Sequence, residues 1–146
     1  MTRRRPGRLP RWQEWTVYAS FGLLIATGIA WLLFDHFVRV AGEFGPEPHP
    51  AEHWALVAHG VVAYAFLVVA GTMIPVHVVA GWNSRRNLKS GITFASVLLL
   101  LALSGLGLYY VGGEIARQWI SISHWVIGLI AVPTVLIHAV KGRGSR

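Results

Sequence analysis

Four of the seven histidines lie inside long stretches of sequence that carry no charged side chain. His59 and His77 close the apolar run HGVVAYAFLVVAGTMIPVH, and His124 and His138 lie in a second such run near the C-terminus. A lone histidine in this setting can be a neutral structural residue that hydrogen-bonds a neighbouring helix. Four of them, paired in position, favour a binding role, because ionisable side chains within membrane segments are rare and face the bundle interior.

The spacing of these histidines places each pair on one helical face. His124 and His138 are 14 residues apart, which returns to within ~40° of the same face at a rise of about 21 Å. His59 and His77 are 18 residues apart, which is five full turns and about 27 Å. The two helices run in the same direction, so we expect His59 to pair with His124 near one membrane surface. By the same reasoning His77 pairs with His138 near the opposite surface. The two spacings differ by about 6 Å of rise, and Pro75 could kink or locally unwind its helix to absorb part of this difference.

Two opposed imidazoles in an apolar slab suit a haem iron, which takes two axial nitrogens within a large, flat, apolar macrocycle. Zinc suits the site less well, because it takes four ligands and no carboxylate or thiol lies at these depths. A proton relay remains an alternative, although relays usually include Asp or Glu and the four apolar segments contain neither. Gly60 and Gly128 lie beside or one turn from these histidines. They would let a macrocycle approach, or would serve helix–helix contact instead.

Four long segments without Asp, Glu, Lys or Arg predict the elements that position the histidines. Each holds at least 19 residues, and a helix of roughly 20 residues crosses a hydrocarbon core of ~30 Å. The sequence therefore predicts an all-α integral membrane protein, an up-and-down bundle of four helices within a domain of residues 12–140. The first segment is too long for the apolar region of a signal peptide, and we expect it to be a permanent anchor. The predicted helices cover residues 12–36, 53–82, 90–111 and 118–140.

The charges outside these helices predict the orientation of the bundle. Eleven of the 13 basic residues fall in the tail of residues 1–11, in the loop between the second and third helices, and in the tail of residues 141–146. The other side of the predicted bundle holds only Arg39 and Arg117 but five of the six acids. The positive-inside rule then places both termini in the cytoplasm. Because orientation explains the basic clusters behind the net charge of +7, no nucleic-acid partner is expected.

Other features of the sequence set further expectations. No cysteine is present, which excludes disulfides, Cys-ligated zinc, iron–sulfur clusters and covalently attached c-type haem. The outer loop DHFVRVAGEFGPEPHPAEH is rich in Pro and Gly, so we expect no long regular element there, beyond a short interfacial helix at its start. We identify no internal repeat. The loop histidines are expected to be solvated surface residues: His36, His49 and His53. An alternative for His53 is that it caps a helix or lies beside a site.

The last helix, ISHWVIGLIAVPTVLIHAVKGR with its two histidines, resembles the four-helix, di-haem b-type cytochromes. These include the bacterial b561-type proteins and the gamma subunits of formate dehydrogenases. RRNLKSGITFASVLLLLALSGLGLYY resembles the third helix of such subunits, with Ser-Gly where many have Thr-Gly, and RWQEWTVYASFGLLIATGIAW resembles the first. The similarity covers most of residues 11–142, and its specific part is the histidine pattern. The resemblance carries the role of axial haem ligand directly to His59, His124 and His138.

The sequence departs from that family at the start of the first helix. Where the family usually places a haem ligand, this chain reads Trp12-Gln13-Glu14-Trp15. His77 is then the candidate for the fourth ligand at that depth, which implies a variant of the family. The alternative is that a single haem binds, or that the inner haem is ligated differently.

The resemblance also implies a cofactor and a function. It implies two non-covalent b haems, or at least one, in the inner membrane of a bacterium, with electron transfer between the quinone pool and a periplasmic or membrane-associated redox partner protein. The chain is then an electron-transfer subunit of an oxidoreductase complex rather than a stand-alone enzyme, surrounded by lipid and open to homo- or hetero-oligomerisation. Candidate partners for the haem propionates, each of which could instead be an ordinary surface charge, are Arg39, Arg85, Arg86 and Arg117.

A competing hypothesis is a non-redox membrane protein, such as a small assembly factor or a transporter subunit with structural histidines. Four buried histidines in two stacked pairs argue against it. A transporter would more often show intramembrane acids or broken, repeated helices.

Overall fold

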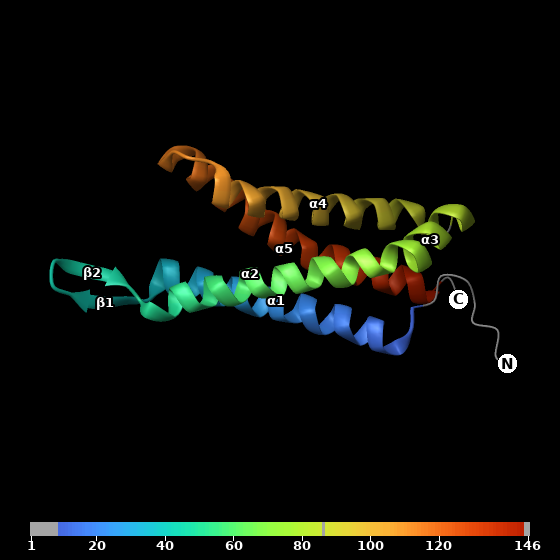
Figure 1. Ribbon diagram of the computed structural model, residues 1–146, viewed down its shortest axis with the longest axis horizontal. Helices are drawn as coiled ribbons and strands as arrows, with labels where there is room; N and C mark the ends of the chain where they lie inside the picture. The colour runs from blue at the N-terminus through green and yellow to red at the C-terminus, as the bar shows by residue number, and fades with distance from the viewer. Residues whose placement is uncertain (1–8, 86, 145–146) are drawn as a thin grey trace. The chain divides into compact units, whose positions relative to one another are not determined.

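The computed structural model describes residues 9–85 and 87–144, and almost all of them are helical (Figure 1). Its elements run in the order α1 (Arg11–Phe37), β1 (Arg39–Gly42), β2 (Gly45–Pro48), α2 (Pro50–Met73), a π-helical turn (Ile74–Val78), α3 (Val79–Ser84), α4 (Leu88–Tyr110) and α5 (Glu114–Gly144). The four long helices predicted from the sequence are present, and the second is interrupted by the π-helical turn. Residues 1–8, 86 and 145–146, which belong to the predicted basic tails and loop, lie outside the described residues.

The helices form two units, and each unit is built on a helical hairpin. The first unit extends to His77, and within it α1 and α2 lie side by side (Figure 1). The second unit begins at Val78, and within it α4 packs along α5. Consecutive helices joined by a short connection return along each other, so each unit brings its two long helices together in antiparallel order.

The four long helices have the length and the surface of membrane-spanning segments. Each is long and apolar enough to cross a bilayer, and no more than 6% of the apolar window in any of them is buried. Among the described residues, the buried hydrophobic side chains are Phe21, Phe66 and Ala131. So much exposed apolar surface is a liability in water but is matched by lipid, while a helix satisfies its backbone polar groups internally. The fold is that of a multi-pass membrane protein.

Packing in the first unit centres on one aromatic contact. The ring of Phe21 on α1 lies 6.0 Å from that of Phe66 on α2, with the planes tilted by 50°, a geometry that aromatic pairs favour. Ser20, beside this contact, is also buried and donates its hydroxyl to the Thr16 carbonyl at 2.7 Å. The hydroxyl is thus satisfied within its own helix. Lipid is as apolar as these side chains, so shape and close packing, rather than the hydrophobic effect, hold the pair together.

A short β-hairpin joins α1 to α2. Its strands pair antiparallel, with Gly42 opposite Gly45. Gly45 has a φ of +130°, a conformation that residues with a side chain rarely adopt, and a Cβ on Gly42 would collide with the side chain of Glu47. The two glycines therefore allow the chain to reverse within two residues. The short interfacial helix expected at the start of this loop is instead the last turn of α1, which continues to Phe37.

His49 fixes the start of α2. Its Nδ1 accepts a hydrogen bond from the N–H of Ala51 at 3.0 Å, which caps one of the amides that a helix leaves unsatisfied in its first turn. Its ring also stacks on Phe34 of α1, with the centroids 5.1 Å apart. The expectation of a solvated residue is wrong for His49, which is a half-buried helix cap, whereas His36 and His53 are exposed.

The second membrane helix changes its winding around Pro75. Proline has no backbone N–H and its ring clashes with the preceding turn, so a regular α-helical ladder cannot continue through it. Ile74–Val78 form a π-helical turn instead, in which hydrogen bonds run from i to i+5 and each residue rotates through a smaller angle. His77 lies inside this turn. The local unwinding expected at Pro75 is present, and the segment from His59 to His77 is therefore not a run of regular α-helical turns.

In the second unit, polar contacts tie the start of α4 to the end of α5. Arg85 and Asn87 both adopt left-handed backbone conformations, with φ of 51° and 55°. The side-chain amide of Asn87 donates to the carbonyl of Lys141 at 3.3 Å. Because α5 continues to Gly144, the predicted tail of residues 141–146 begins as a continuation of that helix.

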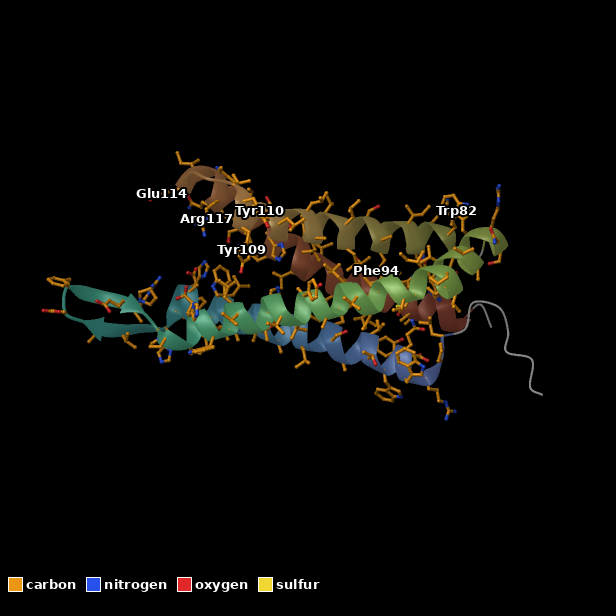
Figure 2. The ribbon with its side chains drawn as sticks, viewed as in Figure 1. Trp82, Phe94, Tyr109, Tyr110, Glu114 and Arg117 are labelled. Carbon is orange, nitrogen blue, oxygen red and sulfur yellow. The ribbon has the colours of Figure 1, made fainter. Side chains whose placement is uncertain are left out.

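Aromatic side chains mark the ends of the second unit. Figure 2 shows Tyr109 and Tyr110 at the end of α4, near Glu114 and Arg117 of α5, and Trp82 at the opposite end. The three aromatic side chains are all largely exposed. Amphipathic rings at such positions lie at the headgroup level of a bilayer, so they mark the two expected membrane surfaces.

Replacing Phe66 with alanine should weaken the first hairpin, because a ring that is only 4% exposed loses its packing against Phe21. We expect the free energy of unfolding to fall by about 2 kcal/mol, less than the ~3–5 kcal/mol of a water-soluble core, because the unfolded helices stay in an apolar solvent. Denaturation in mixed detergent micelles, followed by circular dichroism, measures this loss. Tyr64→Ala removes a ring that is 75% exposed and is the matched control. Equal losses in both variants would contradict the packing.

Candidate histidine sites

His59 lies on the face of α2 that packs against α1. Its Nδ1 is 3.0 Å from Oγ1 of Thr27, a hydrogen-bonding distance. The next residue on α1 is Gly28, and a Cβ built there would lie 3.3 Å from Cε1 of the ring, closer than most carbon contacts. The missing side chain at Gly28 therefore lets the imidazole lie against α1.

His124 is held in the same way in the second unit. Its Nδ1 is 2.8 Å from Oγ of Ser104 on α4. The next residue is Gly105, where a Cβ would lie 3.6 Å from Cε1 of the ring. A hydroxyl thus bonds the imidazole while the following glycine leaves space beside it.

His138 repeats the arrangement nearer the C-terminal end of α5. Its Nδ1 is 3.3 Å from Oγ of Ser90, and a Cβ on Gly91 would lie 3.7 Å from its Cε1. Phe94 of α4, labelled in Figure 2, stacks on the ring with the centroids 5.8 Å apart and the planes at 21°. The imidazole therefore contacts three residues of α4: the hydroxyl of Ser90, the backbone at Gly91 and the ring of Phe94.

These hydroxyl contacts favour one tautomer of each ring, because all three involve Nδ1. A Ser or Thr hydroxyl has one hydrogen and two lone pairs, and in all three cases its own helix already takes the hydrogen. We infer that the hydroxyl oxygen accepts from Nδ1–H, in which case the neutral imidazole carries its lone pair on Nε2. Nε2 is therefore the nitrogen that can ligate a metal. The ring of His59 also forms a hydrogen bond with the backbone of Leu24. The hydroxyls donate to backbone carbonyls as follows: Thr27 to Leu23 at 2.7 Å, Ser104 to Leu100 at 2.7 Å and Ser90 to Asn87 at 3.0 Å.

The three contacts form an internal repeat, where none was expected from the sequence. Wherever Ser or Thr directly precedes Gly in this chain, the pair meets a histidine. The spacing between Ser90 and Ser104 on α4 equals the spacing between His124 and His138 on α5. Equal spacings keep both contacts in register along an antiparallel pair. This match of spacings is the signal in the sequence that could have revealed the hydroxyl partners.

The first hairpin has a different polar contact at the position that corresponds to Ser90 in the second hairpin. Gln13 precedes Thr27 by the same interval that separates Ser90 from Ser104. The side chain of Gln13 is only 4% exposed, and its amide donates to Oγ1 of Thr72 on α2 at 2.7 Å. An amide–hydroxyl pair thus stands where the second hairpin has a hydroxyl–imidazole pair. Gln13 belongs to the stretch Trp12-Gln13-Glu14-Trp15, which has no histidine where the resembled cytochromes usually have one.

His77 has a different backbone setting from the other three membrane histidines. It lies in the π-helical turn, beyond Thr72 on the same membrane helix, and its side chain is half-buried. Because each residue of this turn rotates through less than an α-helical step, the direction of His77 is offset from the stripe calculated for a regular helix. Its role as the inner ligand stays a prediction.

The arginines predicted as propionate partners lie at the ends of the units. Arg39 begins β1 and donates to the Asp35 carbonyl at 2.7 Å. Arg85 follows the last residue of α3, and Arg117 lies near the start of α5 beside Glu114 (Figure 2). All three side chains are exposed, so the structure places them at the surface.

The glycines beside the rings differ from those considered in the sequence. A Cβ on Gly128 would lie 3.9 Å from Leu101 of α4, which is a helix–helix contact, and a Cβ on Gly60 would meet no described atom within 4 Å. The glycines that face imidazoles are Gly28, Gly91 and Gly105.

Within residues 9–85 and 87–144, no three His, Cys, Asp or Glu side chains gather closely enough to hold a metal ion together. A site with two axial histidines does not form such a cluster, so this finding concerns centres of the zinc type. No family model, curated protein or solved structure matches the chain. The resemblance to di-haem cytochromes therefore rests on the residues alone.

The tautomer of His124 can be measured in cofactor-free protein. With 15N-labelled histidine, we expect Nδ1 to be protonated and Nε2 to be unprotonated, because Ser104 can only accept. Ser104→Ala removes the acceptor and should produce a mixture of both tautomers in the ring 15N shifts. Ser96→Ala, at an exposed position of the same helix, is the control and should leave His124 unchanged. A protonated Nε2 in the wild type would show that the assignment is wrong.

Proposed function

We propose that the chain is a membrane b-type cytochrome that carries electrons across the bilayer through two non-covalent haems. In this proposal the two hairpins assemble into a four-helix up-and-down bundle with both termini in the cytoplasm. The observation that carries it is the repeated hydroxyl–imidazole contact of His59, His124 and His138. Metal-ligating histidines almost always donate their other ring N–H to a neighbouring acceptor in this way.

The residues present suit a haem. Each of the three rings lies against a glycine; a Cβ at Gly28 would crowd the ring of His59, whereas a Cβ at Gly91 or Gly105 would make an ordinary contact. The surrounding helices are apolar, as the macrocycle requires. When bound between two imidazoles, the haem iron supplies one-electron oxidation and reduction without an open coordination site. The protein's own task is to orient Nε2 of each ligand and to keep water and charge away from it.

The outer site has the stronger support. His59 and His124 are both held by a hydroxyl and a glycine, and we assign them to one haem, with one ligand from each hairpin. His138 would pair with His77 at the inner site. The buried amide–hydroxyl pair occupies the place of the family's usual ligand, so the fourth imidazole would come from the π-helical turn. If a single haem binds, the outer pair is its site.

The proposed partners belong to the two ends of the bundle. Quinone or quinol in the membrane, and a redox protein on the periplasmic side, would exchange electrons with the two sites in the inner membrane of a bacterium. Arg39 and Arg117 at the outer end and Arg85 at the inner end are exposed and could pair with propionates, which point toward water. The chain would serve as the electron-transfer subunit of an oxidoreductase complex, alone or as an oligomer.

A non-redox membrane protein with structural histidines is the second candidate function. The same hydroxyl–imidazole bonds would then serve to hold helix pairs together, each contributing about 1 kcal/mol. The shared tautomer favours the cytochrome. A structural bond can use either ring nitrogen, whereas all three bonds here use Nδ1.

Protein made with haem supplied should show a Soret band and, after reduction, a b-type alpha band, with about two haems per chain. His59→Ala and His124→Ala should each remove one of them, because a bis-His haem loses an axial ligand. Pyridine haemochrome quantitation measures the content, and His36→Ala, at an exposed position of α1, is the control. A colourless wild-type protein would contradict the proposal. If His77→Ala keeps both haems, His77 is not the inner ligand.

Ser104→Ala should weaken haem binding at the outer site while leaving the ligand in place. Loss of such a supporting hydrogen bond typically lowers metal affinity by about 10- to 100-fold. Transfer of haem to an excess of apo-globin measures the effect. Ser104→Thr should restore wild-type retention, because its hydroxyl can accept the same bond, and Ser96→Ala should behave as wild type. Unchanged retention in Ser104→Ala would count against the role of this hydroxyl.

A further inference from the structure

The β-hairpin between α1 and α2 carries a bare aromatic ring at its tip. Phe44 is 93% exposed and lies in the two-residue loop between Gly42 and Gly45. Its neighbours in this segment include Glu43 and Glu47, both exposed, and residues 42–47 contain no basic side chain. The tip therefore combines one apolar anchor with two carboxylates.

Two prolines leave the outer edge of β2 without donors. Pro46 has no N–H, so it and its partner Ala41 cannot form a hydrogen-bonded pair, and the bonded pairs are those on either side. In an antiparallel ladder the residues between bonded pairs direct their amides outward, and in β2 these residues are Pro46 and Pro48. The ribbon cannot extend a neighbouring sheet on that side, which favours the tip as the point of contact.

The hairpin is long enough for its tip to extend beyond the headgroup region of a bilayer. The uncharged stretch of α1 ends at Phe34, and the continuation of the helix to Phe37 adds about 4–5 Å. The strands of the hairpin add about 13 Å, and in Figure 1 they continue away from the ends of α1 and α2. The headgroup region on each side of a bilayer is about 5–8 Å thick. With the helices placed across a bilayer as proposed, Phe44 would therefore reach water beyond the headgroups.

We propose that this tip, residues 42–47, docks a soluble, basic redox protein, with Phe44 inserted into an apolar pocket surrounded by Lys and Arg. The proposal rests on the function and orientation proposed above, which make the hairpin periplasmic. Buried aromatic anchors carry much of the binding energy at protein interfaces. Five of the six acids lie in the segments on this side of the chain, against Arg39 and Arg117. This charge attracts a positively charged partner and speeds its encounter.

Lipid is the other occupant to consider for Phe44. Aromatic side chains that anchor a protein on an anionic membrane are accompanied by Lys and Arg, whereas Glu43 and Glu47 accompany this ring. The reach of the hairpin beyond the headgroups points the same way. The carboxylates and the length of the strands therefore favour a protein partner.

Site-specific photo-crosslinking in the native host tests this docking. Benzoyl-phenylalanine is placed at position 44 of the full-length chain, cells are irradiated, and adducts are identified by mass spectrometry. We expect one soluble protein that has a basic surface and a redox group. The same probe at position 37, where Phe37 is 79% exposed at the end of α1, is the matched control and should give lipid adducts or none. Lipid adducts at position 44, no protein adduct, or an acidic or cofactor-free protein would each overturn the proposal.

Kinetics with the crosslinked protein, once purified, separate docking from the cytochrome function. The haem-loaded chain in nanodiscs is reduced by a quinol analogue, and electron transfer to the partner is followed. Phe44→Ser should lower the second-order rate constant by about 10-fold or more, and Phe37→Ser should not. Both variants should keep the wild-type haem content and rate of reduction by quinol. Replacing Glu43 and Glu47 together with Gln should flatten the dependence of the rate on ionic strength.

A wild-type rate in Phe44→Ser would overturn the docking proposal while leaving the cytochrome function intact. A wild-type chain without haem would instead remove the proposed function, and the adducts at position 44 would then decide whether the tip still binds a soluble protein.

Discussion

A polar side chain inside a bilayer must find its partner within the protein, because lipid offers neither donors nor acceptors. The chain meets this constraint with hydroxyls that each serve two neighbours. Ser104 donates to the Leu100 carbonyl of its own helix and accepts from His124 of the adjacent helix. One hydrogen bond across the hairpin thereby connects the two helices and orients the ring through its Nδ1. The space beside the ring and the register of the helix pair depend on the same bond.

The same need for a partner within the protein applies at the contact between Gln13 and Thr72, where no imidazole is present. Thr72 donates its hydroxyl to the Val69 carbonyl at 2.6 Å and accepts from the amide of Gln13. The hydroxyl is again shared between its own helix and a partner on the adjacent helix. A buried polar contact can therefore persist in this fold whether or not its second member is able to bind a metal. Whether such a contact could also bind a metal depends on the side chain beside the hydroxyl, an imidazole or an amide.

The sequence predicts the helices well, and it makes the candidate ligands easy to identify, because both depend on conspicuous local features. A run such as Ile92 to Tyr110 has no charge to interrupt it, and it falls within α4 as observed. The partners of the histidines are less visible. Ser and Thr are common in membrane helices and can satisfy themselves locally, so composition does not tell which of them faces a neighbouring helix. Pro75 indicates that the helix is interrupted, but not that the interruption is a π-helical turn. The hairpin turn at Gly45 depends on a backbone conformation that several turn types share.

The proposed inner and outer sites differ in their backbone, and this difference has a consequence for an electron carrier. Two equivalent sites would have equal reduction potentials and give electrons no preferred position. The potential of a haem depends on the hydrogen bonding and solvent exposure of its ligands. His59 lies on a regular α-helix and contacts a threonine and a glycine. His77 lies instead in a π-helical turn, on the side of the membrane helix that leads to Arg85. Both side chains are half-buried, but an inner ligand in this setting would lie at the end of the membrane helix that is followed by basic residues. Proximity to positive charge favours the reduced state, which carries one positive charge fewer, so the proposed inner haem would be the more easily reduced of the two.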